Sequence, residues 1–152
     1  MTKLDQFESV FKSADKAVYT YDRPMFDRVL LVTDLNEADA ADITSRVRSF
    51  LTAINDASTR WDTLSGDAFG SVQALLESIE ECKPDLIVTY RHLHSEAWQW
   101  PYSLGEYLDV MTQATPFPVL VVPHPRNAKA WDDGPPDLDR VMALTDHLAT
   151  EG

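Results

Sequence analysis

Side chains able to do chemistry gather just after the most apolar run of the chain. This run, residues 86–88, reads Leu-Ile-Val and is too short for a helix, so it predicts a strand buried on both faces of a parallel sheet. Ligands in such sheets bind at the carboxyl ends of strands, where the strand order reverses. We therefore expect a functional site in the loop 90–103. Its candidate residues are Tyr90, Arg91, His92, His94, Trp98, Trp100 and Tyr102.

The pair His92 and His94 allows two kinds of chemistry. On a strand, alternate residues share a face, so both imidazoles would be available to one metal ion. Only Glu96 is close in sequence as a third ligand, and in a loop the spacing carries less meaning. Arg91 and the histidines would instead attract an anion. Both alternatives stay open.

A second pair, Thr33 and Asp34, ends the predicted strand 28–34. In a parallel sheet it lies at the same edge as the loop 90–103. Asp34 can accept hydrogen bonds from a ribose, or it can act as a cap or turn residue. No Ser-His-Asp, Cys-His or paired-carboxylate arrangement stands out by its spacing, so we expect binding rather than catalysis.

Strands alternate with helices along the chain, which predicts an α/β fold with three α/β/α layers and a mostly parallel sheet. Asn36 is expected to cap the first helix of the domain, with Asp39 at the third position beyond it. The strands are expected at 28–34, 60–64, 86–88 and 118–123. The helices are expected at 37–54, 68–82 and 103–114.

Four segments follow from composition and from an internal repeat. Residues 1–25 form an N-terminal arm with a predicted helix at 3–14 and a strand at 17–21. Residues 26–125 form the α/β domain, and the Pro- and Asp-rich residues 126–138 form a linker. The segment 139–152 begins Asp-Arg-Val and continues to Thr-Asp, as residues 27–34 do. We interpret it as the start of a second, truncated copy of the domain.

Composition limits the partners. The 152 residues include 44% hydrophobic residues and carry a formal net charge of -12, which disfavours nucleic acid and anionic membranes as partners. No stretch reaches the roughly 20 apolar residues of a membrane span, and the N-terminus lacks an apolar signal core. The single cysteine, Cys82, suggests a reducing compartment. We expect a cytoplasmic protein.

In order and spacing, residues 26–125 resemble the universal stress protein family, which belongs to the HUP superfamily (adenine-nucleotide alpha hydrolase-like). The strand ending in Thr33 and Asp34 is similar to the family's first strand, whose last residues lie at the nucleotide. Gly105 lies thirteen residues before Pro118, as the last family glycine lies before its Pro-Val-Leu-Val-Val strand. Together with the repeat, this resemblance implies the first domain of a tandem protein.

The chain departs from the family at the phosphate site. ATP-binding members of that family carry a motif similar to Gly-x-x-Gly followed, after nine residues, by Gly-Ser or Gly-Thr. Glycines suit this motif because backbone amides must approach the phosphates without a Cβ in the way. Here Tyr90 and Leu93 stand where the early glycines belong, and Glu106 follows Gly105 in place of a hydroxyl residue. A second family strand and helix are also missing between residues 54 and 60.

The resemblance therefore implies a degenerate nucleotide site. Its residues are Thr33, Asp34, Tyr90, Arg91, His92, Gly105 and Glu106. ATP or AMP is a possible ligand, but we expect weak binding or none, and no cofactor. Trp98, Trp100 and Tyr102 can form a stacking wall for a base. We expect them instead to fill the hollow where family members hold ATP, or to cover an interface.

The implied function is a stress-response module that binds and signals without catalysis. One alternative is a nucleotide-binding protein or enzyme of the same superfamily that uses Arg91, His92 and Asp34 instead of glycines. Another is a purely structural dimerisation module. We expect a homodimer through the strand Pro118–Pro123, because its apolar residues are expected at a sheet edge. The resemblance implies the same, since family members pair their final strands across a two-fold axis.

Overall fold

The strands form one sheet in which all neighbours are parallel. The structure is a computed structural model that describes residues 25–51, 58–100 and 102–127, apart from the side chain of Trp98. The strand order is β2-β1-β3-β4. Leu30 pairs with Asp62 on one side and with Ile87 on the other, and Ile87 pairs with Val119. The strands are β1 (Arg28–Val32), β2 (Arg60–Leu64), β3 (Leu86–Thr89) and β4 (Val119–Val121).

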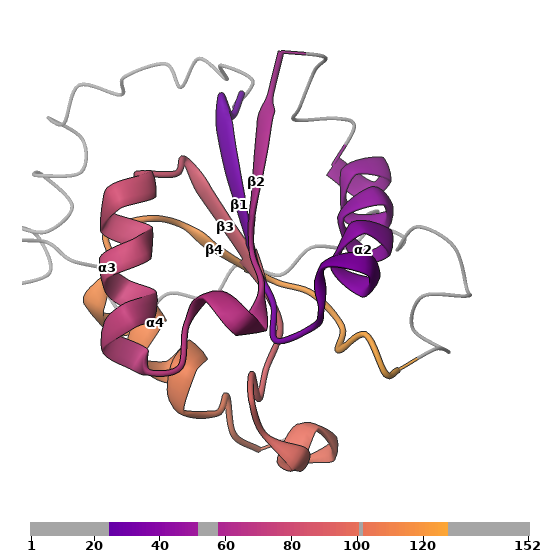
Figure 1. Ribbon diagram of the computed structural model, residues 1–152, viewed down its shortest axis with the longest axis vertical. Coiled ribbons are helices and arrows are strands. Elements are labelled where there is room, and N and C mark those ends of the chain that lie inside the picture. The colour runs from indigo at the N-terminus through magenta and orange to yellow at the C-terminus, as the bar shows by residue number, and fades with distance from the viewer. Residues whose placement is uncertain (1–24, 52–57, 101, 128–152) are drawn as a thin grey trace, which may run out of the picture.

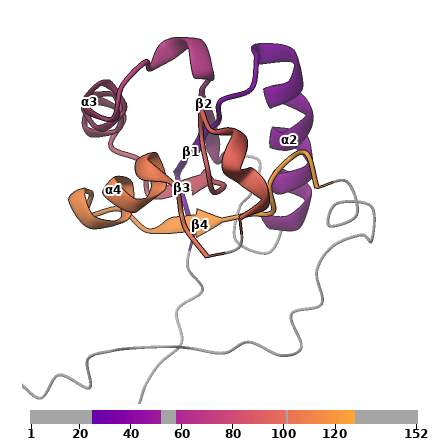
Figure 2. The same cartoon turned by 90° about the horizontal axis from the view of Figure 1, so that it is seen from below.

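Three helices cover the two faces of this sheet. The helix α2 (Glu37–Phe50) lies on one face, and α3 (Val72–Cys82) and α4 (Glu106–Ala114) lie side by side on the other (Figures 1 and 2). This division follows from right-handed crossovers, because the step from β1 to β2 runs in one direction and the next two steps run in the opposite direction. The predicted α/β fold with a parallel sheet is confirmed.

The core lies around β1 and β3, the two central strands. Residues 29–32 and 86–88 are all buried, as expected for strands covered on both faces. Each helix adds an apolar stripe at helical spacing. The buried residues of these stripes are Ala40, Ile43 and Val47 in α2, Leu75 and Ile79 in α3, and Leu108 and Met111 in α4.

Helix starts follow local capping. Asn36 caps α2 as predicted, because its side-chain oxygen accepts the Asp39 N–H at 3.0 Å. The predicted start of this second helix, at residue 68, was too early. Residues 66–68 form the 3-10 helix η2, and α3 begins only after Ser71, whose side-chain oxygen accepts the Ala74 N–H. The start of α4 was also too early, because Gly105 has φ 83° and cannot be a helical residue.

Several predictions fall on residues outside the described ranges. These are the helix 3–14 and strand 17–21 of the N-terminal arm, almost all of the linker 126–138, and the repeat 139–152. The predicted helix 37–54 is also too long, because α2 ends at Phe50 with Leu51 as its C-cap; residues 52–54 lie outside the described ranges. Among the helices of the described ranges, none has the length and apolar character to cross a bilayer.

Candidate functional site

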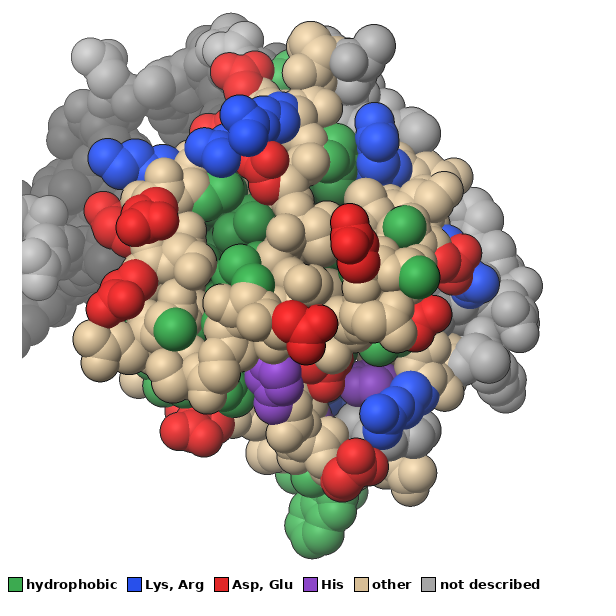
Figure 3. Space-filling view, in the orientation of Figure 1, with side chains coloured by type: hydrophobic (Ala, Val, Ile, Leu, Met, Phe, Trp, Pro, Cys, Tyr) green, Lys and Arg blue, Asp and Glu red, His purple; other side chains and the backbone are tan. Residues whose placement is uncertain are grey.

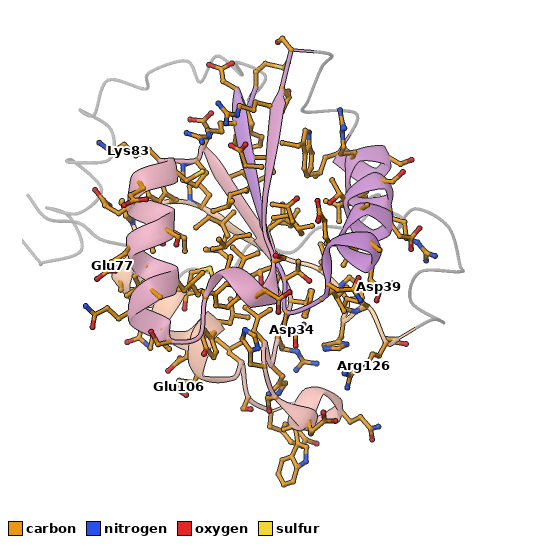
Figure 4. All side chains as sticks on the ribbon, in the orientation of Figure 1. Asp34, Asp39, Glu77, Lys83, Glu106 and Arg126 are labelled. Carbon is orange, nitrogen blue, oxygen red and sulfur yellow. The ribbon has the colours of Figure 1, made fainter. Side chains whose placement is uncertain are left out.

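The strand order reverses between β1 and β3, and the residues after these two strands meet at this point. Tyr90 follows β3 and is fully buried. Its hydroxyl lies 2.6 Å from Thr33 Oγ1 and 3.1 Å from the Asp34 nitrogen, and it donates to the Asp34 carboxylate. The structure thus brings together Thr33, Asp34 and Tyr90, which the sequence predicted as site residues. Asp34 is labelled in Figure 4.

Every oxygen in this cluster has a partner within the chain. The second carboxylate oxygen of Asp34 accepts the His94 N–H at 3.0 Å, and Thr33 Oγ1 accepts the Leu35 N–H at 3.1 Å. Since Tyr90 donates its one proton to Asp34, the Thr33 hydroxyl donates to the Tyr90 oxygen. The side chains that would contact a ribose are therefore engaged with one another.

The electrostatics keep Tyr90 neutral. Burial raises the pKa of the Tyr90 phenol, and its hydrogen bond to Asp34 raises that pKa further. The ring of His124 packs edge-on against the Tyr90 ring, with centroids 4.8 Å apart. Burial lowers the pKa of His124, an effect that the Asp34 charge opposes. A neutral phenol with an acceptor carboxylate holds two strand ends together and does not act as a base.

His124 is a neighbour that the sequence did not predict. It follows β4, the last strand of the described residues, and the strands of the described sheet are parallel, so the chain beyond β4 reaches the same edge as Asp34 and Tyr90. The sequence signal for it is its position directly after the predicted strand 118–123.

His92 supports the loop from inside. It is buried and has φ 63°, a conformation in which few residues other than glycine occur. Its N–H donates to the Leu104 carbonyl at 2.9 Å, and Nε2 lies 3.2 Å from the Trp100 carbonyl and 3.3 Å from Ser103 Oγ. Since a carbonyl only accepts, Nε2 carries the proton. The imidazole therefore holds residues 100 and 103, while the His92 backbone holds residues 95 and 104.

His94 points elsewhere and does not complete a metal site with His92. It also has positive φ, 54°, and its ring lies 4.9 Å from the Phe69 ring and 5.3 Å from the Tyr107 ring. Across the part of the chain that the structure describes, no three His, Cys, Asp or Glu residues are placed to hold a metal ion. The geometry of these residues does not support the metal alternative.

Gly105 serves packing. A Cβ at this position would lie 2.8 Å from the Cα of His92, so only glycine lets the start of α4 approach the His92 backbone. Glu106 is exposed at the first position of α4, away from Asp34 in Figure 4. The guanidinium of Arg91 lies 3.4 Å from the Trp100 carbonyl. The predicted residues thus divide into the hydroxyl–carboxylate cluster and a set that shapes the loop.

The prediction that tryptophans fill the family's nucleotide hollow is wrong for Trp100. Its side chain is 66% exposed and Tyr102 is 93% exposed, while the side chain of Trp98 lies outside the described residues. Tyr90 is the aromatic residue buried at the switch point. A separate hollow of about 530 Å³ lies beside α2 and contains none of the predicted site residues. Its lining is Glu37, Ala40, Ala41, Thr44, Ser45, Arg48 and Thr63.

Comparisons with known proteins add no further constraint. No family model, no curated protein and no solved structure matches this chain. The resemblance to universal stress proteins consequently stays a proposal, based on the residues named above.

Proposed function

We propose that this chain is a universal stress protein-like module of HUP-type topology that binds and signals in stress response without catalysis. Support comes from the order β2-β1-β3-β4, whose switch point lies between β1 and β3. The Thr33–Asp34 pair stands there beside the loop that follows β3. Further support comes from the chemistry of the cluster, in which the phenol is neutral and both carboxylate oxygens of Asp34 accept hydrogen bonds from the chain.

The degenerate nucleotide site rests mainly on one observation. Both carboxylate oxygens of Asp34 accept hydrogen bonds from the chain itself, from the Tyr90 hydroxyl and the His94 N–H. A ribose that took the place of the Tyr90 hydroxyl on Asp34 would leave a buried donor without its acceptor, which costs about 1–3 kcal/mol. We therefore expect ATP and AMP to bind weakly or not at all.

Calorimetry of the purified chain with MgATP and with AMP tests this proposal, and a thermal-shift screen with divalent metals accompanies it. No heat of binding and no shift of the melting temperature are expected. Micromolar affinity for MgATP would contradict the proposal and favour the alternative nucleotide-binding protein or enzyme. In that case Arg91→Ala and Asp34→Ala would each weaken the binding.

We also propose a homodimer through the strand Pro118–Pro123. In the described sheet β4 lies at one edge, and Val121 is 44% exposed there. An exposed apolar edge strand favours pairing with a second chain, and an isologous contact would close after two copies. Light scattering at micromolar concentration should give a dimer mass, reduced to a monomer mass by Val121→Lys. A monomeric wild type would contradict this proposal and the structural-module alternative.

A further inference from the structure

The edge of the described sheet that β2 forms is open. The Arg60 N–H donates to a carbonyl just before β1 at 2.8 Å, and the Leu64 carbonyl accepts an N–H just after β1 at 3.0 Å. Successive residues of a strand direct their backbone groups to opposite sides. The N–H and carbonyl groups of Trp61 and Thr63 therefore point away from β1. No hydrogen-bond partner for these groups lies among the described residues.

A hollow of about 530 Å³ lies beside this open edge. Thr63 lines it from β2, and one flank of α2 lines it from the other side with Glu37, Ala40, Ala41, Thr44, Ser45 and Arg48. The four residues in the middle of this flank are small, so room remains for the side chains of another chain. In the orientation of Figure 1, Figure 3 shows acidic, basic and small hydrophobic side chains together on the surface that α2 forms.

Opposite charges stand at the two ends of the hollow. Glu37 is the first residue of α2, and Arg48 lies in its last turn with its guanidinium 5.6 Å from the centroid of the Trp61 ring. Both charged residues are exposed, and neither forms an ion pair among the described residues. The two positions lie about 16 Å apart along the helix axis, at 1.5 Å per residue. Each charge is therefore available to a partner of its own.

The direction of α2 places these charges along β2. The helix begins beyond the carboxyl end of β1 and runs back toward the start of β2, where Arg48 meets Trp61 (Figure 1). Glu37 consequently lies toward the end of β2 and Arg48 toward its start. A chain that ran antiparallel to β2 would pass Glu37 first and Arg48 last, and antiparallel pairing is slightly the more stable kind.

We propose that the open edge of β2 and the hollow beside it, together called the β2 groove, bind an extended segment of a partner protein as an antiparallel strand. The backbone groups of Trp61 and Thr63 bond its main chain, as in other additions of a strand to a sheet edge. Alternate side chains of this strand face α2. A basic residue in its first position and an acidic residue in its fifth are about 14 Å apart, which suits Glu37 and Arg48.

This inference goes beyond the role proposed above and concerns the edge of the sheet opposite β4. A monomeric wild type, or micromolar binding of MgATP, would contradict the earlier proposals and leave the β2 groove unaffected.

An NMR titration of the whole isotope-labelled chain tests the proposal with the peptide Lys-Val-Thr-Val-Glu, blocked at both ends. The amide signals of Trp61 and Thr63 should shift as this peptide binds. A control peptide with Lys and Glu exchanged should bind about five-fold more weakly, as expected for the loss of two exposed ion pairs. A second control carries N-methyl groups on the amides that face β2. It should not bind, because it cannot donate to the carbonyls of the edge.

Variants of the chain separate the β2 groove from general attraction. Glu37→Gln and Arg48→Gln should each weaken the binding about two-fold. Glu77→Gln and Lys83→Gln remove matching exposed charges at α3, over the other face of the sheet, and should leave it unchanged (Figure 4). Thr63→Pro removes an outward N–H without breaking the pairing with β1, a position where an edge strand tolerates proline. It should weaken the binding about ten-fold in a chain that circular dichroism shows to be folded.

Several results would overturn the proposal. These are an absence of shifts at Trp61 and Thr63 with about 1 mM peptide, equal binding of the charge-exchanged peptide, and undiminished binding by folded Thr63→Pro. Equal effects of the groove variants and the α3 variants would also overturn it. So would a dimer that Thr63→Pro dissociates, because the β2 edge would then belong to a second copy of the chain.

Discussion

Tyr90 and Trp100 belong to the same loop and have opposite environments. Tyr90 is fully buried, although it carries a hydroxyl, and Trp100 is largely exposed, although its ring is the larger one. The two environments differ because the polar atoms of the two residues have different hydrogen-bond partners. The Tyr90 hydroxyl finds Thr33 and Asp34 at the end of β1, so its burial leaves no polar group without a partner.

The comparison shows that aromatic residues in a loop are not sorted by hydrophobicity alone. Tyr90 directly follows a central strand, so its position is set by the sheet. Trp100 is held to the domain by its backbone, because its carbonyl contacts His92. Its side chain is mostly exposed. The inner residue therefore contributes more to stability than the outer residue does.

The substitution with the largest expected effect is Tyr90→Ala. It removes a buried ring from the junction of β1 and β3, and large aromatic side chains lost from cores typically cost 3–5 kcal/mol. Urea denaturation followed by circular dichroism should show a loss of unfolding free energy of about this size. A loss below about 1 kcal/mol would break the comparison, because it would mean that the site relaxes around the missing ring.

Gly105→Ala should come next. The new Cβ would clash with the Cα of His92 at a residue with φ 83°, and a strained backbone of this kind costs about 1–3 kcal/mol. The matched control is Gly70→Ala, since a Cβ at Gly70 meets no atom within 4 Å. Chemical denaturation should show no loss of stability for this control. Equal effects of the two changes would contradict the packing role of Gly105.

Tyr90→Phe isolates the hydroxyl, and its effect should be smaller than that of Tyr90→Ala. Removing one hydrogen-bonding partner from a buried network costs about 1–3 kcal/mol. The folded state raises the pKa of Tyr90 above its ordinary value of 10.0, so the folded chain keeps a proton that the unfolded chain loses at high pH. This stability is complete below pH 10 and decreases as the pH rises further.

The pH dependence supplies the control for that prediction. Unfolding free energies measured on both sides of pH 10 should fall less steeply for Tyr90→Phe than for wild type. All other ionisable groups are the same in both proteins, so the difference between the two slopes reports Tyr90. Identical slopes would show that the phenol is not held neutral in the folded chain.

The smallest effect on stability is expected for Trp100→Ala. Substitutions of exposed side chains usually change the unfolding free energy by no more than about 0.5 kcal/mol. Urea denaturation should therefore place this variant close to wild type, in contrast to Tyr90→Ala. A loss of about 2 kcal/mol or more would show that the Trp100 ring packs on the domain and would remove the contrast.

The sequence by itself determined the order of the strands and helices along the chain, because that order depends on local patterns. The apolar run 86–88 predicts a buried strand, and Asn36 with Asp39 predicts a helix start; both are confirmed. It also placed Thr33, Asp34 and Tyr90 at one edge, since parallel strands end at the same side. The predicted helix starts at residues 68 and 103 were too early, because residues 66–68 form a 3-10 helix and Gly105 has φ 83°.

Only the tertiary structure decided what these residues do at that edge. Whether a side chain of the loop 90–104 lies inside or outside depends on contacts with residues far away in the sequence, such as Thr33 and Asp34 for Tyr90 and Phe69 for His94. The positive φ angles of His92 and His94 have only a weak sequence signal, since neither residue is glycine. The same holds for Gly105, whose need for a missing Cβ arises from the approach of His92 and not from a phosphate.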